Sequence, residues 1–240
     1  MLRWMGTDGP VTRAVTDRSG GVSREPYAGL NLGAHVGDDV GDVEENRTRL
    51  ASALALPTDS LVLLEQLHGR EVAVVDSVPQ RPPCADAVVT TTSGLALVVL
   101  VADCTPVLLA DPDAGVVAAV HAGRPGLVAG VVGAAVTAMR DLGARHVDAV
   151  VGPSVCGRCY EVPEPMRADV AAVAPCSGTV SWTGTPALDV AAGVVAQLRG
   201  LGVPLRWLPG CSREDDALFS YRRDGRTGRF AGVVTLGAAA

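Results

Sequence analysis

The sequence predicts a single α+β domain in which paired strands and separate helices form layers. Three observations support this class. The 240 residues correspond to one large domain or two small ones, at roughly 100–200 residues per domain. No Pro-, Ser- or Gly-rich linker separates blocks of different composition. Strand patterns follow one another in pairs while helical patterns stand apart, unlike a regular strand–helix alternation. We therefore expect one domain over residues 1–240.

Hydrophobic periodicity defines the elements in chain order. Asp42–Leu56 has leucines at helical spacing, with Asp42 as the N-cap. Gly126–Leu142 is a helix of small residues, and further helices are expected at Pro163–Val173 and Leu188–Leu201. The C-terminal 237–240 is expected to be a frayed end. Apolar, β-branched runs predict strands at Leu61–Leu64, Glu71–Val75, Ala87–Thr91, Leu95–Val101 (after a turn at Ser93-Gly94), Val107–Ala110, Val116–His121, His146–Gly152, Arg206–Leu208 and Phe230–Leu236.

Composition excludes several classes of function. Hydrophobic residues make up 48% of the chain but aromatic residues only 3%, so the core must consist of Ala, Val and Leu. A net charge of −6 argues against nucleic-acid binding, which needs a basic surface. All 20 cationic side chains are Arg, which excludes Schiff-base, P-loop and Ser-Lys chemistry. Any phosphate must be bound by Arg, backbone amides or a metal ion.

The chain carries no pattern typical of export or membrane insertion. The N-terminus lacks an apolar signal segment. Asp103 and His121 interrupt the longest apolar runs, so neither run reaches the length of a membrane span. Without a signal, the six cysteines are expected to be reduced thiols. We therefore expect a cytoplasmic protein with no membrane partner.

Two histidines and one cysteine form the most informative set. His68, Cys104 and His121 each lie where a predicted strand meets a loop, which is where side chains converge on a cavity. Two imidazoles and a thiolate suit a catalytic zinc ion with water as the fourth ligand, whose pKa would be near ~7. Three interpretations stay open: this zinc site, a metal-free Cys104 nucleophile with His121 as base, and residues with unrelated structural roles. Asp103 should face away from Cys104, toward substrate or a supporting contact.

Other motifs are less specific. Cys156 and Cys159 form a C-x-x-C, which suits a zinc knuckle or a redox pair, but a structural zinc would need a second such pair. We therefore interpret them as buried or loop thiols. Near the C-terminus, Arg226 and Arg229 are interpreted as part of a solvated turn. Arg222 follows an apolar and aromatic run and is expected to point inward.

Eight blocks of sequence together resemble a known family. The resemblance spans residues 29–232 and is to the laccase-domain, or YfiH-like, purine nucleoside phosphorylases, formerly called multicopper polyphenol oxidases. It implies a mixed β-sandwich flanked by helices, similar to toxin deamidase domains that use a Cys-His pair. It also implies that His68, Cys104 and His121 are the zinc ligands. The blocks are GLNLGAHVGDD, ENRTRL, EQLHG, ADAVVTT, VADCTPVLLAD, VAAVHAG, VGPSVCGRCYEV and FSYRRDGRTGR.

The chain departs from the family pattern at one block. Its histidine count also bears on the older description of the family as multicopper oxidases. The family usually has H-A-G-W-R-G, whereas this chain has Arg124 and Pro125 in place of the Trp and Arg, which can alter phosphate or substrate contacts. With only four histidines, the chain cannot supply both a His-Cys-His site and a multinuclear copper cluster. Copper can still replace zinc at the His-Cys-His site, because it binds such ligands more tightly.

The resemblance implies an enzyme that uses purine nucleosides and phosphate. The implied activities are phosphorolysis of adenosine, inosine, guanosine and methylthioadenosine, and deamination of adenosine. The alternatives are a metal-free Cys-His hydrolase or deamidase and a non-enzymatic partner of cell-envelope or division proteins; the oligomeric state stays open. The expected roles are His68, Cys104, His121 and Asp103 in catalysis, with Glu65 or Asp103 moving protons, Arg47 and Arg222 on phosphate, and Asn31, Gln66 and Tyr160 on ribose or base.

Overall fold

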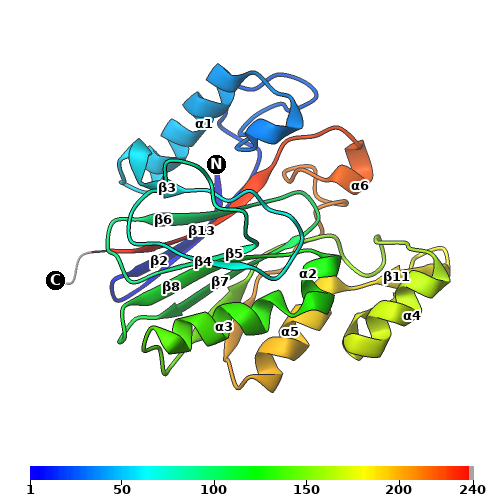
Figure 1. Ribbon diagram of the computed structural model, residues 1–240. Coiled ribbons are helices and arrows are strands. Elements are labelled where there is room, and N and C mark those ends of the chain that lie inside the picture. Colours follow the sequence, from blue (N-terminus) through cyan, green and yellow to red (C-terminus); the bar gives the residue numbers. More distant parts are fainter. Residues whose placement is uncertain (238–240) are drawn as a thin grey trace.

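Two β-sheets stacked face to face form the centre of the molecule, and helices cover both outer faces (Figure 1). This is the flanked sandwich that the sequence predicts. The computed structural model describes residues 1–237, so the frayed end expected at 237–240 lies, apart from Gly237, outside the described residues. Within that part, no helix has both the length and the apolar character needed to cross a bilayer.

The first sheet has five strands in the order β1-β2-β13-β6-β3. Neighbouring strands are antiparallel, except that β3 runs parallel to β6. The strands are β1 (Leu2–Asp8), β2 (Val11–Thr16), β13 (Phe230–Leu236), β6 (Ala96–Val101) and β3 (Leu61–Val62).

The second sheet has six strands in the order β12-β9-β7-β8-β5-β4. Its inner pairs are antiparallel, and the edge strands β12 and β4 run parallel to their neighbours. A separate hairpin joins β10 (Gly178–Val180) to β11 (Pro186–Leu188). The six strands are β12 (Leu205–Trp207), β9 (Asp148–Val151), β7 (Thr105–Asp111), β8 (Val116–Ala122), β5 (Ala87–Thr90) and β4 (Val72–Val74).

The central strands are uninterrupted apolar runs because both of their faces are covered. On β6, Val98 packs toward α1 while Val99 packs into the space between the sheets. On β8, Ala118 faces the helices and Ala119 faces the other sheet. The helices are α1 (Val40–Ala53), α2 (Arg124–Ala129), α3 (Val131–Asp141), α4 (Glu164–Val173), α5 (Val190–Gly200) and α6 (Tyr221–Asp224), with single 3-10 turns at η1 (Ala34–Val36), η2 (Thr58–Ser60) and η3 (Pro175–Ser177).

Several local expectations need correction. The predicted helix at 126–142 is two helices, because Gly130 has φ 83° and ends α2. The side chain that caps α1 is Asp39, which accepts the N–H groups of Gly41 and Asp42. The N-terminal hairpin of β1 and β2 was not predicted, because its strands mix polar and apolar residues without a clean alternation.

Strands that are neighbours in the sequence are not always partners in space. β5 and β6 flank the predicted turn at Ser93-Gly94, but they belong to different sheets. The same holds for β3 and β4, and for β6 and β7. Only β7 and β8 form the expected antiparallel pair. The chain therefore passes repeatedly from one sheet to the other, and these crossings carry the candidate site.

Candidate functional site

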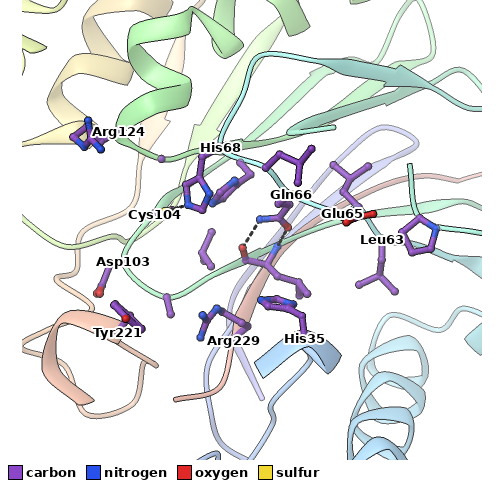
Figure 2. Close-up of a pocket in the computed structure, with 18 of the residues that line it drawn as sticks. His35, Leu63, Glu65, Gln66, His68, Asp103, Cys104, Arg124, Tyr221 and Arg229 are labelled. Atoms are coloured by element: carbon purple, nitrogen blue, oxygen red, sulfur yellow. Dashed lines mark hydrogen bonds between the residues drawn. The ribbon is translucent and has the colours of Figure 1, made fainter. Parts of the chain in front are cut away.

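The structure brings His68, Cys104 and His121 together, and we call this group the His-Cys-His centre. His68 lies in the crossing between β3 and β4, Cys104 in the crossing between β6 and β7, and His121 near the end of β8. One potential ligand atom from each residue lies within 4.8 Å of the other two. Cys104 Sγ is 3.7 Å from His68 Nε2, and the two imidazole rings meet edge to face with centroids 4.7 Å apart. Figure 2 shows His68 and Cys104 at the pocket wall.

One buried carboxylate positions both histidines. Asp86 Oδ1 is 2.8 Å from His121 Nδ1, which leaves His121 Nε2 for a ligand. The backbone N–H groups of Leu67, His68 and Gly69 donate to the same carboxylate at 3.2, 2.9 and 2.6 Å. These bonds hold His68 in the left-handed region, at φ 59°. Sequence reasoning missed Asp86, because a single Asp before a strand carries no local signal of contacts with two distant histidines.

The residues of the His-Cys-His centre shift one another's pKa values. Its enclosed position alone would raise the pKa of the Cys104 thiol, but the His121 imidazolium and hydrogen bonds to both histidines lower it to about 6. Burial disfavours protonated His121, yet the Cys104 thiolate and the Asp86 carboxylate raise its pKa to about 9. The structure therefore favours a thiolate next to an imidazolium.

The donor set and its surroundings fit a zinc ion. Two imidazole nitrogens and a thiolate are the ligands that Zn²⁺ prefers, and three protein ligands leave one position free. A carboxylate on the far nitrogen of a ligating histidine is the usual supporting contact. Gly123 packs against the centre: a Cβ there would lie 2.6 Å from His68 Cδ2 and 3.1 Å from Cys104 Sγ. Only glycine lets the start of α2 approach so closely.

The centre opens into a cavity of about 1230 Å³. Four of the five predicted substrate residues line it: Arg47, Gln66, Tyr160 and Arg222. Arg222 lies over the ring of Tyr160, with 4.9 Å between the guanidinium carbon and the ring centroid. The departure from the family pattern is also at this site, because Arg124 lines the same cavity.

Two of these residues already have strong protein partners. Arg47 donates from Nε and Nη2 to the carbonyl of Leu32, at 3.1 and 2.9 Å. The Gln66 amide donates to the Leu100 carbonyl and accepts the Leu100 N–H, each at 2.8 Å, as Figure 2 shows. Gln66 therefore extends the hydrogen-bonding edge of β6.

The structure changes the expected role of Asn31 and shows what Asp103 contacts. Asn31 is fully buried and is not among the residues that line the cavity; its Oδ1 accepts the N–H groups of Gly33 and Arg229. Asp103 lines the cavity, but its carboxylate accepts the Ser212 and Ser220 hydroxyls and the Arg222 N–H, each at 2.6 Å. Asp103, at φ 96°, thus holds the C-terminal loops in place. These are the supporting contacts that the sequence predicts for Asp103, and its catalytic role stays a prediction.

The interpretation of Arg229 as part of a solvated turn is wrong. Arg226 is exposed, but Arg229 is half-buried and lines the cavity beside His35 (Figure 2). Its Nη1 donates to the carbonyls of Thr227 and Gly228, at 2.9 and 3.0 Å. Burial and the charges of Arg229 and Arg47 lower the pKa of His35, which favours a neutral ring. An arginine-rich turn gives no local sign of which guanidinium turns inward.

A second group of donors lies at the junction of two loops. Cys156 and Cys159, after β9, meet Cys211 and Glu214, after β12, and four potential ligand atoms lie within 4.8 Å of one another. We call these four residues the thiolate cluster. Burial and the neighbouring Cys156, Cys211 and Glu214 raise the pKa of Cys159 to about 12, although Arg213 opposes this. The C-x-x-C pair is joined by Cys211 and Glu214, a C-x-x-E pair that a search for a second C-x-x-C does not find.

Comparisons with known proteins agree with this arrangement. The sequence pattern of the family described as multi-copper polyphenol oxidoreductase laccase matches residues 12–237. A purine nucleoside phosphorylase of Streptomyces coelicolor is 60% identical, covering 92% of this chain and 93% of that protein. One from Mycobacterium tuberculosis is 48% identical, covering 94% and 92%.

Solved structures have the same fold. The Neisseria meningitidis protein NMB0706, of the DUF152 family, has a TM-score of 0.88 at 32% identity and covers 99% of both chains. YlmD from Geobacillus stearothermophilus has a TM-score of 0.87 at 31% identity, covering 95% of this chain and 92% of that one. The chain belongs to the multi-copper polyphenol oxidoreductase laccase family, whose relatives include proteins named purine nucleoside phosphorylase.

Proposed function

We propose that this protein is a purine nucleoside phosphorylase that works in the cavity beside a zinc-loaded His-Cys-His centre. One observation carries the proposal: the centre opens into a cavity whose wall combines arginines with aromatic and apolar side chains. That wall suits a ligand with a flat ring at one end and an anion at the other. Relatives between 46% and 60% identical that are named purine nucleoside phosphorylase support it.

Arg229 is the best-placed group for phosphate. The chain contains no lysine, so arginine is the only side chain that carries a permanent positive charge for an anion. Arg229 lies close enough to Cys104 and Asp103 for their charges to act on its guanidinium. Because two carbonyls accept hydrogen bonds from Nη1, the planar guanidinium is held in one orientation. Its Nε and Nη2 can then donate to an oxyanion. Arg222 is a second phosphate candidate, and Arg47 a weaker one because two of its nitrogens bind Leu32.

Phosphorolysis then needs the nucleoside to be held between this anion and an aromatic wall. A phosphate oxygen forms a bond to C1′ of the ribose, and the C1′–N bond breaks with its electron pair passing to the purine. Tyr160 with Arg222 over its ring offers a flat surface on which a purine can stack. A nearby cation such as Arg222 stabilises the charge that develops on the leaving base.

The His-Cys-His centre would polarise a bound substrate atom or water molecule. A zinc ion there would act as a Lewis acid and would lower the pKa of a bound water. Asp86 keeps His121 Nε2 and the His68 loop in the orientation that such an ion needs. We extend the proposal to adenosine deamination, in which water replaces the exocyclic amino group of adenine and ammonia leaves. Glu65, which lines the cavity, is the remaining carboxylate for proton transfer, since Asp103 has three donors of its own.

The test combines metal analysis with product analysis. The purified protein is incubated with adenosine and phosphate, and adenine, inosine and ribose 1-phosphate are measured alongside zinc and copper content. We expect His68→Ala and His121→Ala to lose both the metal of this centre and the products. Arg229→Gln should retain the metal and raise the KM for phosphate at least tenfold. Full turnover by His121→Ala protein that has lost the metal of this centre would contradict the metal role.

A second function is favoured by one specific contact. Cys104, His121 and Asp86 stand in the order nucleophile, base and orienting carboxylate, which is the arrangement of a cysteine hydrolase. A chelator separates the two candidates. It should abolish phosphorolysis by the zinc enzyme and leave a thiol hydrolase fully active, whereas alkylation of Cys104 inactivates both.

A further inference from the structure

We propose that the thiolate cluster binds a second zinc ion, with a structural role, through Cys156, Cys159, Cys211 and Glu214. This site is separate from the His-Cys-His centre and does not depend on the proposed function. The proposal rests on the backbone turns that present the four side chains, on the spacing of their donor atoms, and on the residues that surround them.

The two ligand pairs have the same local design. In C-G-R-C and in C-S-R-E, the two ligands are three positions apart. The Cys159 and Tyr160 N–H groups donate to the Cys156 carbonyl at 2.9 and 3.1 Å. Likewise, the Glu214 and Asp215 N–H groups donate to the Cys211 carbonyl at 3.1 and 2.9 Å. Each turn therefore places its two ligands on one side, as in a zinc knuckle.

The two turns are fixed against each other by the backbone. Ser154 and Cys211 form a parallel bridge, and the Ser212 N–H donates to the Ser154 carbonyl at 3.0 Å. The Cys156 N–H points at Cys211 Sγ, at 3.4 Å. An amide donor aimed at a sulfur is a supporting contact for a metal-bound cysteine. The pairing thus exists before any ion binds.

The donor atoms are nearly at coordination distance. With Zn–S bonds of about 2.3 Å, tetrahedral sulfurs lie about 3.8 Å apart, and the four donors here all lie within 4.8 Å of one another. Contraction by about 1 Å closes the site. Three thiolates favour zinc over hard cations, and four protein ligands leave no position for substrate, which is typical of structural zinc. Binding releases the three thiol protons to solvent.

The surroundings complete the site. Trp182 Nε1 donates to Glu214 Oε1 at 3.2 Å, which orients that carboxylate. Three thiolates, a carboxylate and Zn²⁺ carry a net charge of −2. One arginine in each turn, Arg158 and Arg213, offsets this charge; Arg158 lies 4.2 Å above the Trp182 ring.

The position of the site gives it a consequence for the cavity. Tyr160, which lines the cavity, directly follows Cys159. Ser212, which donates to Asp103 at 2.6 Å, directly follows Cys211. The proposed zinc would therefore fix one loop that continues into a cavity-lining residue and another that continues into a donor to the cavity-lining Asp103.

Metal counting on the full-length protein tests the proposal. Total metal is measured by mass spectrometry after gel filtration in a mild chelator. We expect Cys159→Ser to lose one equivalent per chain and His121→Ala to lose a different one, so that the double variant loses both. The matched control is Cys176→Ser, an exposed cysteine outside both groups, which should keep the wild-type content. An unchanged content in Cys159→Ser would overturn the proposal.

Cobalt substitution tests the ligands directly. When Cys84, Cys104 and Cys176 are all replaced by serine, the only thiols left are those of the thiolate cluster. Sulfur-to-cobalt charge-transfer absorption must then come from the cluster, and its absence contradicts the proposal. A chain mass two units lower before reduction than after it would indicate a disulfide among these cysteines, and it would also contradict the proposal.

If Cys159→Ser does not fold, substitutions of the exposed Glu214 test the site instead. Glu214→Ala should lose metal to a chelator at least tenfold faster, and Glu214→His should restore retention; equal retention in all three overturns the assignment.

Discussion

The His-Cys-His centre and the thiolate cluster use similar donors but are built in opposite ways. The centre takes single residues from three places where the chain crosses between the sheets or leaves a strand, and a buried carboxylate fixes the two histidines. The cluster takes two local pairs from loops that lie 55 residues apart. The centre has three potential protein ligands and faces a cavity, whereas the cluster has four, none of which is among the residues that line that cavity. Ligands set on a rigid framework leave room for chemistry, while ligands set on turns hold loops together.

The largest difference should appear when the carboxylate behind the centre is changed. Asp86→Asn keeps the size of the side chain but removes one acceptor from His121 and the 67–69 amides. We expect zinc affinity at the centre to fall 10–100-fold, as when such supporting contacts are lost, with the cluster metal unchanged. Competition with a chelator measures both sites. Asp111→Asn is the matched control, because Asp111 is another buried carboxylate that accepts backbone N–H groups. Loss of affinity in that control as well would break the comparison.

The next effect concerns the close approach of α2 to the centre. Gly123→Ala adds a Cβ 2.6 Å from His68 Cδ2, so the histidine must move. We expect a loss of about 1–3 kcal/mol in unfolding free energy, typical of overpacking, and lower metal retention at the centre only. Gly133→Ala in α3 is the control, since nothing lies within 4 Å of its added Cβ; it should stabilise the protein by about 0.5–1 kcal/mol. Equal effects of the two variants would contradict this account.

A smaller effect should show how the loop of the thiolate cluster supports the cavity wall. Ser212→Ala removes one of three donors to Asp103 and leaves all seven metal-binding candidates intact. We expect a loss of about 1.5 kcal/mol in unfolding free energy, as for one hydrogen bond to a charged acceptor. The KM for nucleoside should rise because the Asp103–Arg222 contact loosens, with metal content unchanged. A fall in metal content would mean that the two regions are less separate than the structure indicates.

The smallest expected effect concerns the pH dependence of stability that comes from a carboxylate outside both regions. Although burial opposes it, hydrogen bonds from the His146, Ala114 and Arg145 amides lower the pKa of Asp111 below 3.8. The stabilisation is therefore complete above the unfolded value and is lost as pH falls through the lower folded value. Denaturant titrations between pH 6 and pH 3 should show a shallower acid loss of unfolding free energy in Asp111→Asn than in wild type. Parallel curves would contradict it.

Sequence reasoning succeeded where the signal is local or continuous. Strands buried on both faces are uninterrupted apolar runs, so β6, β7 and β8 were predicted close to their observed bounds. The sandwich depended on the family resemblance, which also selected the zinc site among the three interpretations that the residues alone left open. Contacts between distant segments gave no such signal: Asp86, Arg229, and the pairing of Cys211 with Cys156 all depend on how loops meet. The crossings between sheets were also missed, because two strands joined by a turn look alike whether or not they pair.

The fourfold use of the Asp86 carboxylate has a consequence for which metal the centre holds. Because one imidazole and three amides are already ordered during folding, ion binding requires little loss of conformational freedom. The empty and loaded forms should then share one backbone, and one ion can leave and another enter without refolding. Such a fixed two-nitrogen, one-sulfur site would accept either zinc or copper, since intrinsic affinity favours copper while cellular availability usually decides. On the proposed function, the ions that the cell supplies would therefore decide the occupant, without any change of fold.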